Sequence, residues 1–173
     1  MDQTGRVIYL GTFSTTLFPG INLGYLVLPR TIFPRFARLR EGSGGFTPTL
    51  YQRILTDLLV EGHFARHVGR MKRLYAARRN ALIQALSDVA SDVLTLGQAD
   101  AGLRLVAFLP EGIDDREVVR LASARQMFPQ ALSSYYASAC NARSGLVLGF
   151  GGGEEGAITR AVGTLAGLIR TLR

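Results

Sequence analysis

Short apolar segments and a polar turn alternate near the start of the chain. Residues 7–10 and 23–28 are rich in β-branched, aromatic and leucine side chains that favour strands. The segment between them is rich in hydroxyl groups and is punctuated by Gly11, Pro19 and Gly20. We therefore predict two buried strands that hold a rigid loop.

The middle of the chain has the periodicity of helices. Apolar residues recur at helical spacing in three stretches, 32–39, 51–59 and 64–86. Gly62 separates the second stretch from the third, and Thr47 followed by Pro48 is typical of an N-cap and a first helical position. The pattern predicts three consecutive helices, of which the last is the longest.

The remainder of the chain alternates between strand and helix patterns. Apolar strand-like runs occupy residues 93–96, 103–109, 126–128 and 146–150. Asp114 and Glu117 have the spacing of a capping box before one helix, and residues 158–172 have the apolar spacing of a final helix. This order predicts an α+β domain in which helices pack on a small sheet.

The turn near the start of the chain carries the candidate chemistry. Thr12, Ser14, Thr15 and Thr16 supply hydroxyl groups. Such groups, together with backbone N–H groups, bind anionic oxygens. Two interpretations stay open from the residues alone: a small-molecule or phosphate site, or a Ser/Thr-rich turn without a ligand.

A family resemblance bears on this choice. Residues 6–29 read RVIYLGTFSTTLFPGINLGYLVLP. They resemble the cofactor-lysine segment of fold type I pyridoxal-phosphate enzymes, and most closely the aminotransferase-like domain of MocR-type (GntR-family) transcriptional regulators. That family has a pattern close to Y-x-G-T-F-S-K-T-L-F-P-G-L-R-L-G-Y-L-x-x-P, which this sequence follows at most of its defined positions.

The resemblance implies a fold and a domain order. The class would be α/β, with a remnant of the large domain of the PLP-dependent transferase fold followed by the small α+β domain. The remnant would occupy residues 1–60, a linking helix residues 61–91, and the small C-terminal domain residues 92–173.

The sequence departs from the family pattern at two chemical positions. Thr15 stands at the Schiff-base lysine, and a hydroxyl group cannot form an imine with an aldehyde. Asn22 stands at a phosphate-binding arginine, and a neutral amide lacks the charged fork of a guanidinium. Thr12 and Ser14 keep their hydrogen-bonding groups. By resemblance, these four residues are the cofactor-binding positions for pyridoxal 5'-phosphate, with no covalent attachment and no catalytic residue expected.

These departures lead to two functional hypotheses. The resemblance covers about the last two-fifths of an aminotransferase-like domain, and the family's winged-helix DNA-binding domain lies outside it. We therefore expect a truncated, inactive aminotransferase class I/II-like chain related to MocR-type regulators. The alternative is an interaction or dimerisation module that pairs with another copy or a separate chain through the exposed large-domain remnant.

Composition narrows the setting. The net charge is +7, and nearly all positive charge is arginine. Arg66, Arg70 and Arg73 have helical spacing without interleaved aromatics, which favours a solvated helix face over nucleic-acid binding. The apolar runs are shorter than a membrane span, no secretory signal is evident, and the lone Cys140 fits a reducing compartment. We expect a cytoplasmic protein without a membrane partner.

Two further motifs are weak. His63 and His67 lie four residues apart, but no third histidine and no well-placed cysteine or carboxylate completes a metal shell, so we predict no metal site. Glycines at 151, 153 and 156 satisfy a dinucleotide-binding pattern after a predicted strand. Too little chain follows them for the second strand and acidic residue of such a site, so we predict a helix start there.

Overall fold

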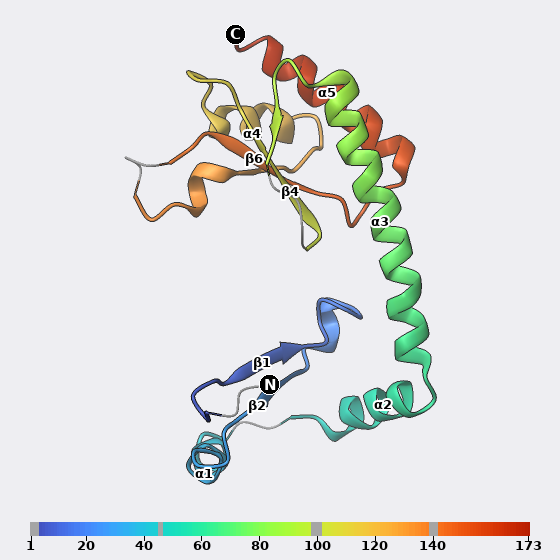
Figure 1. The fold of residues 1–173 in the computed structure, drawn as a ribbon, viewed down its shortest axis with the longest axis vertical. Helices are drawn as coiled ribbons and strands as arrows, with labels where there is room; N and C mark the ends of the chain where they lie inside the picture. The colour runs from blue at the N-terminus through green and yellow to red at the C-terminus, as the bar shows by residue number, and fades with distance from the viewer. Residues whose placement is uncertain (1–3, 45–46, 98–101, 139–141) are drawn as a thin grey trace. The chain divides into compact units, whose positions relative to one another are not determined.

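Two units of secondary structure make up the chain in the computed structural model, which describes residues 4–44, 47–97, 102–138 and 142–173 (Figure 1). The units are residues Met1–Gly69 and Arg70–Arg173. The boundary between them falls within the longest helix, α3 (His63–Val89). The predicted mixed α/β class is confirmed.

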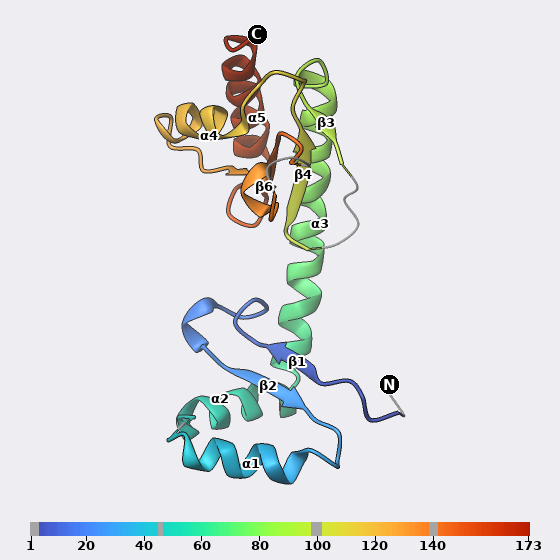
Figure 2. The same ribbon diagram turned by 90° about the vertical axis from the view of Figure 1, so that its left-hand side faces the viewer.

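The first unit contains a β-hairpin and two helices. Strand β1 (Tyr9–Thr12) pairs antiparallel with β2 (Gly24–Val27), and the short 3₁₀ helix η1 (Pro19–Ile21) lies in the connection. Helices α1 (Phe33–Gly42) and α2 (Thr49–Val60) follow. Figure 2 shows the order of these elements. The predicted pair of strands and the predicted helices are therefore present.

The prediction that both hairpin strands are buried is wrong. Almost every residue of β1 and β2 is exposed, and Leu10 keeps 74% of its surface. The buried residues in the described part of this unit are Ile21, Leu23 and Leu55, with Phe13 and Leu17 packed against them. They come from the loop and α2. The two strands pair with each other, and this pairing alone does not cover the faces of the hairpin. The sequence pattern indicates that these side chains are apolar, but it does not indicate whether other residues cover them.

The start of α2 also differs from the prediction. Pro48 is the N-cap and the helix begins at Thr49, whereas Thr47 was expected to be the cap. The Thr47 hydroxyl instead accepts a hydrogen bond from the Arg40 guanidinium. Gly62, at φ +72°, separates α2 from α3 as expected, because a left-handed backbone favours glycine.

The second unit is built on a four-stranded antiparallel sheet. Its strand order is β3 (Thr95–Leu96), β4 (Arg104–Phe108), β6 (Gly145–Gly149) and β5 (Gln130–Ala131). Helices α4 (Asp115–Ser123) and α5 (Glu155–Arg170) belong to this unit, as does the short 3₁₀ helix η2 (Leu132–Tyr135). The predicted arrangement of helices on a small sheet is confirmed.

The strand predicted at residues 126–128 is wrong. Gln126 has φ +60°, the Gln126 N–H donates to the Ser123 carbonyl, and the Met127 N–H donates to the Ala122 carbonyl. These bonds form a Schellman motif that closes α4. The strand begins later, at Gln130, because the preceding residues end the helix.

One face of the sheet and three helices form the main core. The strand residues that belong to this core are Leu105, Ala107, Leu146 and Leu148, which alternate with residues of the opposite face. The buried helix residues that pack with them are Leu82, Leu86, Val118, Ala122, Val162, Leu165 and Ile169. This core is continuous, so we expect it to provide most of the stability of the chain.

The start of α4 fastens several elements together. The Asp114 carboxylate caps the helix by accepting a hydrogen bond from the Arg116 N–H at 3.0 Å. Asp115, only 1% exposed, accepts bonds from the Ser133 N–H at 2.8 Å, the Ser133 hydroxyl at 2.6 Å and the Gly145 N–H at 3.1 Å. One buried carboxylate therefore joins α4, η2 and β6.

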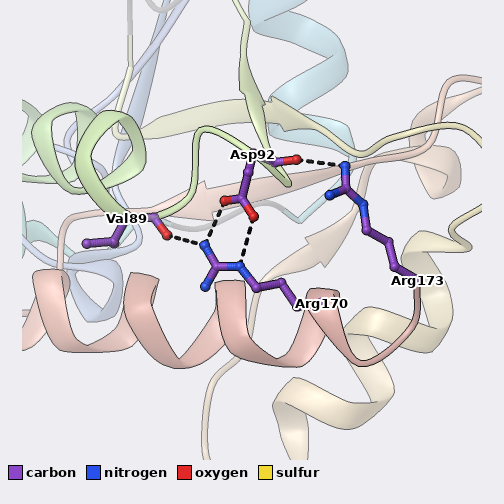
Figure 3. Close-up of polar contacts among 4 residues, drawn as sticks. All are labelled: Val89, Asp92, Arg170 and Arg173. Atoms are coloured by element: carbon purple, nitrogen blue, oxygen red, sulfur yellow. Dashed lines mark hydrogen bonds and ion pairs between the residues drawn. The ribbon is translucent and has the colours of Figure 1, made fainter.

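An ion pair joins the ends of two helices (Figure 3). The Arg170 guanidinium donates to both carboxylate oxygens of Asp92, at 2.9 and 2.6 Å, and to the Val89 carbonyl at 2.8 Å. The Arg173 guanidinium donates to the Asp92 carbonyl. The Arg170 hydrogen bonds lower the pKa of Asp92.

We predict that Asp115→Ala lowers the free energy of unfolding by roughly 3 kcal/mol, because it leaves two backbone N–H groups without their acceptor. Ser133→Ala removes only the hydroxyl donor and should cost about 1 kcal/mol. Urea unfolding monitored by circular dichroism measures both. Equal losses in the two variants would contradict the assigned role of Asp115.

We also predict that the Asp92–Arg170 pair makes stability depend on acid. A carboxyl whose pKa is lowered by folding stabilises the native state above its unfolded-state pKa, about 3.9, and loses this contribution as the pH falls through its folded-state pKa. Over this acidic range the unfolding free energy of the wild type should fall more steeply than that of Asp92→Asn. In an Arg170→Gln background this difference should largely disappear, and its persistence there would exclude the pair as its cause.

Candidate functional site

The hydroxyl-rich loop is held in a fixed turn. The Thr12 hydroxyl donates to the Leu23 carbonyl at 3.4 Å and accepts from the Ser14 N–H at 3.1 Å. The Phe13 N–H also donates to the Leu23 carbonyl, at 2.9 Å, and the Leu17 N–H donates to the Phe13 carbonyl at 2.8 Å. Thr12 therefore supports the loop in addition to any contact with a ligand.

Two residues of α3 anchor the same loop. A ring nitrogen of His67, Nε2, lies 2.9 Å from the Thr16 carbonyl oxygen, and the ring of Phe64 meets that of Phe13 edge-on at 5.8 Å between centroids. His63 pairs instead with Glu61, at 3.0 Å. The two histidines thus have different partners, and His67 has a positioning role that the sequence pattern did not reveal.

Asn22 has a backbone role at the end of η1. Its φ and ψ angles are 41° and 45°, and its N–H donates to the Pro19 carbonyl. Asparagine adopts this left-handed conformation more readily than most residues with a side chain. The left-handed turn thus explains why asparagine is suitable at position 22, independently of any contact with a phosphate.

Gly11 and Tyr25 form a cross-strand pair beside the loop. They lie opposite one another in the hairpin, and a Cβ atom on Gly11 would come within 2.4 Å of the Tyr25 ring. The absence of a side chain at Gly11 therefore lets the tyrosine lie across β1. A side-chain hydrogen bond with Tyr9 raises the pKa of Tyr25, so its phenol is neutral at physiological pH.

A cavity of about 1090 Å³ lies within the first unit, between the hairpin and α1. Thr12, Ser14 and Asn22 line it, so the structure brings together three of the four predicted positions. Thr15 is exposed and is not among the lining residues. The cavity also reaches Arg40 and Glu41 of α1.

The donor set of this cavity fits a phosphate only in part. Hydroxyl and amide groups can donate to phosphate oxygens, but they carry no charge. Arg40 is the cation among the described lining residues, and its guanidinium already donates to Thr47. The only lysine in the sequence, Lys72, belongs to the other unit. The residues present are compatible with non-covalent contacts to a phosphate and do not fit a covalently held aldehyde cofactor.

The other motifs have local roles. The Gly151 carbonyl accepts a hydrogen bond from the Arg78 guanidinium at 2.5 Å, and the glycines around it precede α5, where Glu154 is the N-cap. Among the residues that the structure describes, no group of three potential ligands could hold a metal ion. In the same part of the chain, no helix is both long and apolar enough to cross a membrane.

Comparison with curated proteins gives two informative relatives. The chain is 33% identical over 165 residues to a probable rhizopine catabolism regulatory protein, MocR, of Rhizobium meliloti, with 95% of this chain and 33% of the relative aligned. It is 34% identical over 150 residues to the HTH-type pyridoxine biosynthesis transcriptional regulator PdxR of Corynebacterium glutamicum, with 87% of this chain and 32% of the relative aligned. The chain thus spans about a third of the length of these relatives. No protein-family model matches it.

Solved structures show the same fold. The kynurenine aminotransferase of Pyrococcus horikoshii, solved in complex with PMP, matches with a TM-score of 0.86 and 25% identity over 98% of this chain and 42% of its own. The multiple substrate aminotransferase of Thermococcus profundus matches with a TM-score of 0.87 and 26% identity over 99% of this chain and 42% of its own.

These similarities are consistent with the family motif in the hairpin loop and with the arrangement of helices on a sheet in the second unit. They extend over nearly the whole of this chain, and over only part of each relative. The fold type I family is pyridoxal-phosphate-dependent. The chain is therefore part of a fold type I aminotransferase-like domain, related to the MocR-type regulators of the GntR family.

Proposed function

We propose that this chain is a non-catalytic aminotransferase-like module that does not hold pyridoxal phosphate as a Schiff base. The observation that carries this proposal is the residue at position 15, where the family motif has its lysine. Thr15 has no amine and is absent from the described lining of the cavity. Aldimine formation and proton transfer at the substrate both require that amine in this family.

The surroundings of Thr15 support the same proposal. Asn22 is held in a left-handed turn and offers a neutral amide in place of a guanidinium. The Thr12 hydroxyl is engaged with the backbone on both sides of the loop. The loop thus keeps its shape through contacts that need no cofactor, and we expect any binding of pyridoxal phosphate to be weak and non-covalent.

We predict that borohydride reduction in the presence of pyridoxal phosphate leaves no stoichiometric adduct and that the chain catalyses no transamination. Intact-mass spectrometry and an amino-donor assay with several α-amino acids measure the two outcomes. Lys72→Arg is the matched control, because it removes the only lysine and so exposes adventitious labelling of the N-terminal amine. Saturable labelling of Lys72 accompanied by turnover would overturn the proposal.

A second candidate function is that of an interaction module. One observation favours it: apolar side chains cover the hairpin, yet the hairpin is a two-stranded sheet within the described residues. Its exposed apolar residues are Val7, Ile8, Tyr9, Leu10, Tyr25, Leu26 and Val27. Unpaired strand edges with apolar faces favour pairing with further polypeptide.

The small core of the first unit points in the same direction. Few of its described side chains are buried, so their burial contributes little to the stability of this unit. Another polypeptide segment that covered the hairpin would add the missing burial. We propose that this segment comes from another copy or from a separate chain, which adds a strand at the hairpin edge.

We predict that the chain self-associates or co-purifies with a partner through the hairpin. Light scattering across a concentration series should show a rising mass, or a stable complex, and Leu10→Lys should reduce it because the charge would be buried in the interface. Val60→Lys is the matched control, since Val60 is 80% exposed on α2, outside the hairpin. A constant monomer mass without a co-purifying protein would contradict this role.

A further inference from the structure

A cavity of about 460 Å³ lies within the second unit, apart from the hairpin loop and its cofactor positions. Part of its lining belongs to the main core, with side chains from three elements: Leu82 of α3, Leu148 of β6, and Val162 and Leu165 of α5. The segment between α4 and β5 supplies another part, which includes Met127 and Phe128. A molecule in this cavity would therefore contact the hydrophobic core directly.

The cavity lies where the pairing of β5 with β6 ends. The register that pairs Gln130 with Val147 would place Phe128 opposite Gly149, but β5 begins only at Gln130. Pro129 has no N–H group to donate to the ladder, and the Schellman motif of α4 occupies the residues before it. Phe128 and Gly149 instead line the cavity, and Phe128 keeps 74% of its surface exposed.

The chemistry of the lining selects an uncharged ligand. Among the described lining residues, none is charged, and Gln126 is the one with a polar side chain. A charged group in this cavity would lose water without gaining an ionic partner. The thioether of Met127 and the ring of Phe128 both make favourable contacts with aromatic rings. An aromatic molecule is thus the complementary occupant.

Gln126 is placed to orient such a molecule. It is exposed, and its backbone has a φ angle of +60° at the end of α4. Its amide can donate or accept one hydrogen bond with a polar group on the ligand. Small-molecule sites generally combine an apolar lining with a few polar groups, in volumes of about 300–1,000 Å³. This cavity has that volume and that composition.

We propose that this cavity binds an uncharged aromatic compound with one hydrogen-bonding group. The aromatic body contacts Met127, Phe128 and the core side chains, and the polar group pairs with the Gln126 amide. The site lies entirely in the second unit. It goes beyond the proposed non-catalytic role of the chain and does not depend on the identity of residue 15.

The test is a titration of the full chain with indole, observed by NMR of ¹³C-labelled methionine methyl groups. The Met127 signal should shift saturably, because this side chain lines the cavity. Met71 of α3 is not among the lining residues, so its signal should not shift. Ala161→Phe adds a ring to the lining from α5 and should weaken binding roughly tenfold or more.

Two related compounds test the chemistry of the site. 1-Methylindole lacks the N–H group and should bind the wild type roughly fivefold more weakly than indole. Gln126→Gly keeps the left-handed backbone and removes the amide, so this variant should bind both compounds equally. Indole-3-carboxylate should bind roughly tenfold more weakly than indole, because its charge has no partner in the cavity.

A matched control is Ala76→Phe, the same change at an exposed position of α3 outside the lining, which should leave the affinity unchanged. Thermal unfolding establishes that each variant is folded, and Ala157→Leu narrows the same cavity if Ala161→Phe does not fold. The proposal would be overturned by the absence of a saturable Met127 shift, by an equal shift at Met71, or by undiminished binding in a folded cavity variant. Equal binding of indole and its 1-methyl or carboxylate derivative by the wild type would also contradict it.

Discussion

The pairing of β4 with β6 is the interaction on which the second unit depends. It places Leu105 and Ala107 beside Leu148 and Leu146 on one face, where α3, α4 and α5 bury them. Asp115 connects further elements to this pair of strands: its carboxylate accepts hydrogen bonds from the Gly145 N–H at the start of β6 and from the N–H and hydroxyl of Ser133 in η2. A buried carboxylate is tolerable here because hydrogen bonds satisfy its oxygens.

The first unit has the opposite balance of exposure and burial. Its hairpin carries strand-forming apolar residues, but among the residues of this unit that the structure describes, the buried side chains are Ile21, Leu23 and Leu55. Each fully buried aliphatic side chain contributes about 2 kcal/mol, so this small set cannot match the continuous core of the second unit. This difference in burial between the two units is consistent with the comparisons with solved structures, in which this chain aligns with about 42% of each aminotransferase chain. A surface that is apolar here would be an interior if further polypeptide covered it.

The sequence was sufficient to predict elements whose signals are local. The helix pattern, the break at Gly62 and the cap at Asp114 depend on near neighbours, and the structure agrees with them. Burial of the hairpin could not be predicted, because an apolar strand signals a tendency to be covered and not the presence of a cover. The strand predicted at residues 126–128 is absent because these residues form a Schellman motif with the preceding helix. That motif also depends on contacts that an apolar run does not reveal.

In the candidate site, too, the sequence predicted some features and missed others. Sequence similarity located the loop and the positions of Thr12, Ser14 and Asn22, which the structure places around one cavity. It did not indicate that Thr12 fastens the loop, that His67 contacts Thr16, or that Asn22 has a left-handed backbone. These contacts involve backbone groups and residues distant in sequence, to which a motif is blind. They also separate the shape of the loop from its chemistry: hydrogen bonds to the chain itself maintain the turn, so a lysine is not required for the loop to fold. The same turn therefore forms with threonine at position 15.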